Sequence, residues 1–329
     1  MTRASLAIAT LAAAVATTFL PGRTQRLEGG TFRVGLVFDV GGRGDKSFND
    51  AAWAGIESAQ REAPFEARVY EPSSAEERET ALRMLAASGF DLVIGVGFVF
   101  TADVDAVARD YPRVRFSCVD YALHDARPPN VEALEFRDEE GSFLVGAAAG
   151  LASKTKVVGF VGGMKSPLIE RFATGYSRGV RETCADCTVR SAFVGGTPEA
   201  FRDPVRGRLI AASQIALGAD VVYHAAGATG RGVFEAAREG HAMAIGVDRD
   251  QFDEAPDVML TSMLKRVDVA VADAIRSARK AEPPRGVVAL GVAEGGVDWV
   301  HEGPHARHLD ATVVARVSAL AASLRGTPR

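Results

Sequence analysis

The feature that most constrains this chain is a regular alternation of short apolar runs and amphipathic segments that starts near residue 32. A continuous apolar run is typical of a strand buried in a parallel sheet, and apolar residues three or four apart predict a helix. In the first half, strands are expected at 33–39, 67–70, 91–97 and 113–119, and helices at 47–62, 75–88 and 101–110. Ser47 and Asp50 match a capping box, which predicts that Ser47 caps the first helix. Alternation of this kind predicts an α/β fold.

A second series follows with no proline- or serine-rich linker. Its strands are expected at 157–161, 189–194, 220–224, 242–247, 258–262 and 286–293, and its helices at 141–152, 169–182, 204–217, 230–239, 267–281 and 311–324. Two similar doubly wound units are therefore predicted, which agrees with a length of 329 residues. Ligands of such sheets bind at the carboxyl ends of the strands. Polar residues and glycines stand there: Asp39, Asp120, Gly162–Gly163, Gly227 and Asp248. Each one alone is also a common turn residue.

The first 22 residues have the pattern of a secretory signal peptide. Arg3 precedes an apolar run from Ala4 to Leu20, and Ala14–Ala16 offers a cleavage site. The run is shorter than the roughly 20 residues of a membrane span, and an uncleaved N-terminal anchor remains the alternative. No cysteine precedes Cys118, so the sequence has no lipobox. We expect an exported protein, either periplasmic or attached to the outer face of the cytoplasmic membrane.

The charge and the cysteines exclude several classes of protein. The net charge of −4 argues against a protein that binds nucleic acid polymers, which needs a basic face. Cys184 and Cys187 form a C-x-x-C pair after an expected helix. No second pair is present to complete a zinc ribbon, and a redox motif would open a helix after a strand. In an oxidising compartment the pair favours a local disulfide that closes the helix end.

No motif points to catalysis, a cofactor or a metal ion. The glycine-rich segments 41–47 and 227–232 lack the spacing of phosphate-binding loops, although the second can present backbone N–H groups at a helix start. His301, His305 and His308 are interrupted by Gly-Pro and have no completing ligand, which favours a solvated loop over a metal site. We therefore expect neither a cofactor nor an enzyme.

Six ordered blocks between residues 33 and 296 resemble one known family. The blocks cover 34–55, 158–175, 201–204, 218–232, 245–251 and 260–265. In this pattern the sequence is similar to the basic membrane protein (BMP) family, the solute-binding components of ABC transporters that include purine nucleoside receptors. The resemblance implies a type I periplasmic-binding-protein fold, with two doubly wound parallel-sheet lobes joined by a hinge of three crossovers. It implies residues 32–137 and 265–284 in the first lobe, and 138–264 and 285–329 in the second.

The resemblance also implies a ligand site. Phe48 and Phe201 would sandwich a nucleobase, since stacking on aromatic faces tolerates base identity. Asp39 and Asn49 would hydrogen-bond the base edge. The sugar hydroxyls would be held by four further residues: Asp120, Gly227, Asp248 and Lys265. Core packing for the two phenylalanines, turn formation for the aspartates and a surface position for the lysine remain the structural alternatives.

The implied function is capture of a purine nucleoside by a monomer and its delivery to an ABC permease and its ATPase. Two alternatives stay open. The same site could serve a sensor that presents its closed form to a membrane receptor. A nucleoside-processing enzyme would need a general base or a phosphate site. A DNA-binding repressor of the same fold is disfavoured because a signal peptide, and no helix-turn-helix, precedes residue 33. Family members are typically lipoproteins, from which this sequence departs.

Overall fold

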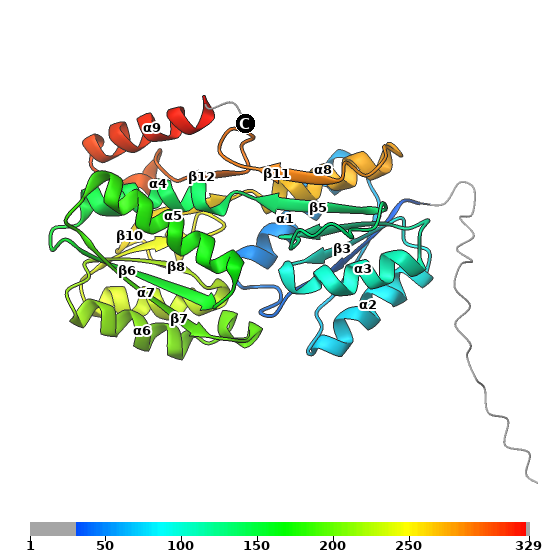
Figure 1. Cartoon of the computed structure of the whole chain (residues 1–329), viewed down its shortest axis with the longest axis horizontal. Helices are drawn as coiled ribbons and strands as arrows, with labels where there is room; N and C mark the ends of the chain where they lie inside the picture. The colour runs from blue at the N-terminus through cyan, green and yellow to red at the C-terminus, as the bar shows by residue number, and fades with distance from the viewer. Residues whose placement is uncertain (1–30, 327–329) are drawn as a thin grey trace, which may run out of the picture.

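Two sheets side by side form the framework of the protein, whose computed structural model describes residues 31–326 (Figure 1). The expected signal peptide or anchor, residues 1–22, lies outside the described residues. Within the described part of the chain, no helix combines the length and the apolar character needed to cross a bilayer.

The first lobe contains a six-stranded parallel sheet with the order β11-β5-β4-β3-β1-β2 among the described residues. Its strands are β1 (Arg33–Val37), β2 (Glu66–Tyr70), β3 (Leu92–Val96), β4 (Arg115–Val119), β5 (Val131–Phe136) and β11 (Val287–Leu290). Helices α1 (Phe48–Glu62) and α8 (Val267–Arg279) cover one face, and α2 (Ala75–Ala87) and α3 (Thr101–Asp110) cover the other. Side chains of β1 alternate accordingly: Leu36 packs toward α1, and Val37 packs toward α2.

The second lobe repeats this plan with the order β12-β10-β9-β8-β6-β7. Its strands are β6 (Val157–Met164), β7 (Thr188–Gly195), β8 (Val221–Ala225), β9 (Met243–Gly246), β10 (Met259–Lys265) and the antiparallel β12 (Val297–Trp299). Helices α4 (Asp138–Ala152) and α5 (Pro167–Thr183) cover one face, and α6 (Pro204–Ala216) and α7 (Gly230–Glu239) cover the other. The last helix, α9 (Ala311–Arg325), lies on α4 (Figure 1).

Glycines allow the helices of the second lobe to approach at backbone distance. A Cβ atom at Gly179 in α5 would lie 2.0 Å from the carbonyl oxygen of Phe143 in α4, and one at Gly146 would lie 2.2 Å from that of Tyr176. Real Cβ atoms do not approach this closely, so any larger residue would push α4 and α5 apart.

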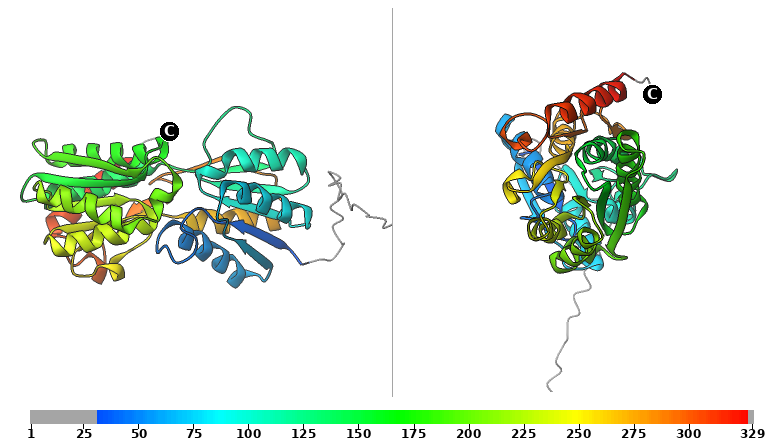
Figure 2. Two further views of the ribbon diagram at one scale, coloured as in Figure 1. Left: turned by 90° about the horizontal axis from the view of Figure 1, so that it is seen from below. Right: turned by 90° about the vertical axis from the view of Figure 1, so that its left-hand side faces the viewer.

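Three segments cross between the lobes, at 136–138, 265–267 and 290–297 (Figures 1 and 2). Each lobe has the doubly wound order, β2-β1-β3-β4-β5 in the first and β7-β6-β8-β9-β10 in the second. Two such lobes joined by three crossovers confirm the predicted type I periplasmic-binding-protein fold, an architecture that closes on its ligand by hinge rotation.

The structure corrects one lobe boundary of the sequence prediction and adds one strand to it. The segment 285–329 was assigned to the second lobe, but β11 pairs with β5 in the first sheet, and the chain crosses back only afterwards. Strand β5 was not predicted at all, because Glu132 and Glu135 interrupt its apolar pattern. Glu132 is fully buried and pairs with both Arg115 and Arg285, contacts that no local pattern reveals.

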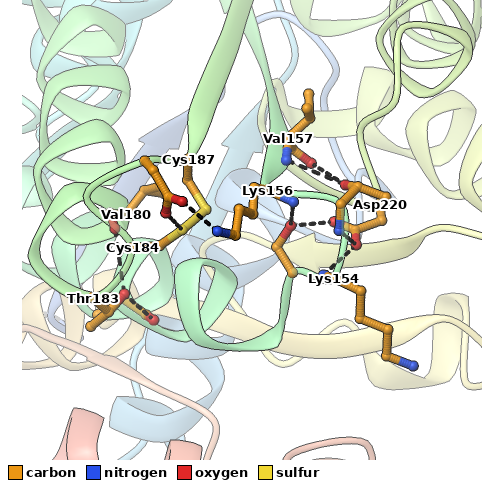
Figure 3. The surroundings of a disulfide bond; sticks show 12 residues. Lys154, Lys156, Val157, Val180, Thr183, Cys184, Cys187 and Asp220 are labelled. Atoms are coloured by element: carbon orange, nitrogen blue, oxygen red, sulfur yellow. Dashed lines mark hydrogen bonds and ion pairs between the residues drawn. A yellow bond between two sulfur atoms is a disulfide. The ribbon is translucent and has the colours of Figure 1, made fainter.

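Cys184 and Cys187 are joined by a disulfide at the carboxyl end of α5 (Figure 3). Beside it, Lys156 at the start of β6 forms an ion pair with Asp186, which lies between the two cysteines. This end of the sheet carries the amino termini of β6 and β7. The disulfide is therefore on the edge of the lobe opposite to the carboxyl ends of the strands. Cys118, the third cysteine, is free and buried in β4.

Candidate ligand-binding site

A cavity lies between the lobes, where the carboxyl ends of the two sheets face each other. It contains about 560 Å³ of space, including its open mouth. All eight residues predicted from the resemblance line it: Asp39, Phe48, Asn49, Asp120, Phe201, Gly227, Asp248 and Lys265. A shared cavity is what the rule for doubly wound sheets predicts, because ligands bind outside the carboxyl ends of the strands.

Strand order gives the cavity two different ends. Asp120 follows β4 and Lys265 ends β10, and both strands lie toward the side of the sheets where the chain crosses between lobes; we call this the hinge end. Asp39 follows β1, two strands from β4, or about 10 Å at the usual strand spacing. Phe201 contacts the positions of Gly163, which lies near the end of β6, and Gly227, which follows β8. The region of Asp39 and Phe201 is the distal end.

Lys265 is the centre of a buried charge cluster at the hinge end. Its Nζ donates to Asp120 Oδ2 at 2.8 Å and lies 3.0 Å from Asp138 Oδ1, at the start of α4. Lys265 is only 2% exposed, and the flanking carboxylates overcome its burial and raise its pKa. The rings of Phe48, Phe136 and Phe172 surround the ammonium at 5.4, 5.0 and 5.3 Å. Lys265 therefore does not occupy the surface position that remained an alternative.

Asp120 and Asp248 adopt left-handed backbone conformations, with φ of +58° and +67°. Such conformations are rare for residues other than glycine and are enriched at ligand sites. Burial raises the pKa of Asp248 to about 6, against the opposing effect of Lys265. Both aspartates end buried strands and turn their carboxylates toward the cavity lining, so they differ from ordinary surface turn residues.

The start of α1 is capped differently from the prediction. The Ser47 side chain does not cap the helix; its hydroxyl donates to Asp248 across the cleft. Asp45 accepts from the backbone N–H groups of Ser47 and Asn49 at 2.9 Å, and from that of Asp50 at 3.1 Å. A carboxylate favours a helix N-terminus because it satisfies free N–H groups and the dipole, and the capping-box prediction was wrong here.

The side-chain amide of Asn49 makes two hydrogen bonds within the first lobe, at the distal end of the cavity. Its Oδ1 accepts from the backbone N–H of Asp39 at 3.2 Å, and its Nδ2 donates to Asp45 at 3.1 Å. Asn49 thus positions Asp39, and one N–H of its amide remains for a ligand.

The two phenylalanines reach the cavity from different lobes. Phe48 begins α1, and Phe201 ends the short helix η2 (Pro198–Phe201). A Cβ atom at Gly163 would lie 2.5 Å from the Phe201 ring, so glycine there leaves room for the ring. The sequence reading missed further apolar lining residues: Phe98, Leu168, Ile169 and Phe172. The sequence signal for Phe98 was the glycine before it, Gly97, which follows β3 and has a φ of +114° in the structure.

A loop of the first lobe, residues 41–47, contacts the second lobe; we call it the clasp loop. Gln251 Nε2 donates to the Lys46 carbonyl at 2.9 Å, and Arg231 donates to the Gly44 carbonyl. Together with the bond from Ser47 to Asp248, these contacts show that the lobes are closed over the cavity.

The three C-terminal histidines make separate contacts. His305 Nδ1 lies 2.5 Å from Asp250 Oδ2, and its ring stacks on Phe252. His301 stacks on Trp299, and His308 lies beside the Pro256 carbonyl. The expected solvated loop is thus packed on the body of the lobe. Between residues 31 and 326, no group of three or more potential ligands could hold a metal ion.

The charges that line the cavity limit the chemistry of a ligand. Four carboxylates and one ammonium group line it, and the ammonium is already paired with two carboxylates. Such a lining accepts hydrogen bonds from hydroxyl and N–H groups and repels a phosphate. Fold, closed cleft and cavity define a two-lobed solute-binding protein.

Comparison with known proteins narrows this class. Residues 32–317 match the family described as "ABC transporter substrate-binding protein PnrA-like", and the chain belongs to this Bmp family. An uncharacterized lipoprotein of Pyrococcus furiosus is 36% identical over 292 residues, 84% of this chain and 72% of that protein. The "ABC transporter nucleoside-binding protein BmpA" of Lactococcus lactis is 32% identical over 288 residues, 81% of this chain and 80% of that protein. A solved solute-binding protein from Aeropyrum pernix has a TM-score of 0.81 at 29% identity, covering 89% of this chain and 91% of that chain.

Proposed function

We propose that this substrate-binding protein captures a purine nucleoside between its lobes for import by an ABC permease and ATPase. The observation that carries the proposal is that one cavity combines aromatic rings from both lobes with a cluster of carboxylates and an ammonium group. Aromatic rings from both lobes suit a flat base, and the carboxylates and ammonium at the hinge end suit the vicinal hydroxyls of a ribose.

The charge of the cavity supports a nucleoside over a nucleotide. Phosphate would meet Asp39, Asp120 and Asp248 in a buried site, where repulsion between like charges is strong. The base, in contrast, carries both donors and acceptors for Asn49 and the carboxylates. The relative from Lactococcus lactis, described as nucleoside-binding, agrees with this ligand class.

The disulfide supports a location outside the cytoplasm. Cys184 and Cys187 would not remain bonded in a reducing compartment. The Pyrococcus relative is described as a lipoprotein, whereas the first cysteine of this chain is Cys118. We propose that the chain acts as a periplasmic monomer or is attached to the outer face of the membrane.

The test is direct. Protein purified without refolding is denatured, and the released small molecule is identified by mass spectrometry. Emptied protein is then titrated by calorimetry with nucleosides, nucleobases, nucleotides and ribose. A nucleoside should bind, and it should raise Tm because it binds only the folded state. No heat and no Tm shift with any nucleoside would overturn the proposal. Release of free base during incubation would instead indicate a nucleoside-processing enzyme. A receptor-kinase gene beside this one, in place of permease and ATPase genes, would favour the sensor.

A further inference from the structure

Asp39 presents a carboxyl group at the distal end of the cavity that protein side chains leave unused. Its Oδ1 accepts from the backbone N–H of Val40 at 2.6 Å. Its Oδ2 lies against Gly97, where a Cβ atom would come within 2.7 Å. Among residues 31–326, no side chain donates a hydrogen bond to either oxygen. Asp39 is 8% exposed and lines the cavity, so its carboxyl group is placed to hydrogen-bond a ligand.

The charges around Asp39 come from three directions and largely oppose one another. Arg78 in α2 favours the ionised form, whereas Asp45 before α1 and Asp120 after β4 disfavour it. The Cys118 thiol in β4 is buried nearby and stays neutral, since burial raises its pKa well above the usual value. Burial dominates the balance and raises the pKa of Asp39 to about 7. Both protonation states are therefore populated near neutral pH.

The two protonation states have opposite hydrogen-bonding character. An ionised carboxylate only accepts hydrogen bonds, and a protonated carboxyl also donates one. Purine bases differ in the same way at one ring position. A 6-oxopurine carries a proton on N1 and donates there, whereas a 6-aminopurine has a bare N1 that accepts.

We propose that Asp39 selects between purine nucleosides by its protonation state, accepting from N1–H of a 6-oxopurine when ionised and donating to N1 of a 6-aminopurine when protonated. The inference rests on the proposed function, and on the base lying at the distal end. The cavity supports that orientation, in which the Phe48 ring, 5.4 Å from Lys265 Nζ, would reach from the hinge end toward the base. The groups suited to ribose, Asp120 and Lys265, lie at the hinge end, and the Phe201 ring lies at the distal end with Asp39.

The ratio of two affinities isolates this effect. Each ligand binds only the fraction of protein in the matching protonation state. The ratio of protonated to ionised Asp39 changes tenfold per pH unit, so the affinity ratio of adenosine to inosine can change at most about a hundredfold between pH 6 and pH 8. Titration of Asp248, at the hinge end, affects both nucleosides alike and cancels in the ratio.

The experiment is calorimetry of the full chain with inosine and with adenosine at about pH 6 and about pH 8, values that bracket the Asp39 pKa of about 7. We expect the affinity ratio to move toward adenosine by at least about tenfold at the lower pH. A ratio constant within about twofold would overturn the inference even if both nucleosides bind. If neither binds at either pH, the proposed function fails instead.

Two further measurements assign the effect to Asp39. Asp39→Asn removes the titration, so its affinity ratio should be independent of pH, whereas Asp248→Asn should keep the shift of the ratio. If Asp39→Asn does not fold, 1-deazaadenosine gives the same information with the unchanged protein. It lacks N1, so its affinity should not gain from the lower pH as that of adenosine does. An equal gain for both would contradict a role of N1.

Discussion

Lys265 Nζ lies 3.0 Å from Asp138 Oδ1, and this buried pair joins two of the three segments that cross between the lobes. Asp138 begins α4 directly after the first crossover, and Lys265 ends β10 directly before the second. Because Lys265 also binds Asp120, one ammonium group neutralises carboxylates from the hinge and from the ligand cavity. Hinge stability and ligand binding thus share a single charge.

Removal of that charge should destabilise the protein. Lys265→Met leaves Asp120 and Asp138 buried without a cation, which should lower the free energy of unfolding by about 3–5 kcal/mol in urea denaturation. Adding Asp138→Asn should restore part of this loss. Lys156→Met is the control, because the Lys156–Asp186 pair is exposed and its loss should cost less than about 1 kcal/mol. An equal effect of both lysine changes would contradict the buried cluster.

The two cavity phenylalanines should contribute to affinity more than to folding. Phe48→Ala and Phe201→Ala should each weaken nucleoside binding by about 10- to 100-fold in calorimetry, because a base loses one stacking face. Phe143→Ala is the control: this half-buried ring lies outside the cavity, beside Arg178. Affinities that remain unchanged in both cavity variants would rule out the sandwich.

The clasp loop should slow ligand release. Arg231→Ala removes the bond from α7 to the Gly44 carbonyl, which should raise the dissociation rate about two- to tenfold in stopped-flow measurements. Arg238, on the same helix, contacts Asp257 and the Glu254 carbonyl within its own lobe. Arg238→Ala should therefore leave the dissociation rate unchanged, and a similar increase in both variants would argue against closure through the clasp loop.

The disulfide should affect stability and not binding. Its loop is short, so the Cys184→Ser/Cys187→Ser double variant should lose at most about 2 kcal/mol of unfolding free energy. Nucleoside affinity should be unchanged, because the bond lies at the opposite edge of the sheet. Thiol titration of the denatured, unreduced protein should find one free thiol, that of Cys118. Three titratable thiols in protein isolated from its native compartment would contradict the bond.

The buried carboxyl of Asp39 should cost stability at high pH. Its native pKa of about 7 exceeds the ordinary value of 3.8, so the penalty is full above pH 7 and falls as the native state takes up a proton. Without ligand, Asp39→Asn should therefore stabilise the protein more at about pH 8 than at about pH 5, by on the order of 2 kcal/mol. Urea denaturation at both pH values measures this. An equal gain for Asp39→Asn at both pH values would contradict the raised pKa.

Much of the fold could be predicted because its information is local. Apolar runs and helical spacing located most strands and helices, and the ordered motifs identified the family. The fold and family predictions are confirmed, and the ligand-binding roles of the eight residues stay predictions. Strand β5 was not predicted because the sequence around Glu132 is polar. The Glu132 carboxylate can be buried because it pairs with Arg115 and Arg285, which are distant in sequence.

The parts of the site that the sequence did not predict also depend on contacts between residues far apart in the sequence. Asp138 carries no local sign of a role, since its partner Lys265 is more than a hundred residues away. Ser47 matches a helix cap, but its hydroxyl binds Asp248 in the other lobe, and Asp45 caps the helix instead. A sequence pattern assigns a polar group to its nearest neighbours, whereas closure of two lobes brings it other partners.

The return of the chain to the first lobe has a consequence for the order of folding during synthesis. Helix α8 buries Val271 and Ile275 against α1, and β11 adds an edge to a sheet whose other strands end at residue 136. A nascent chain that stops before α8 thus exposes the apolar face of α1 and its strands. The first sheet is complete only with β11, which ends at Leu290, and the second only with β12, which ends at Trp299. The two halves must therefore reach their final form together, late in translation, rather than one after the other.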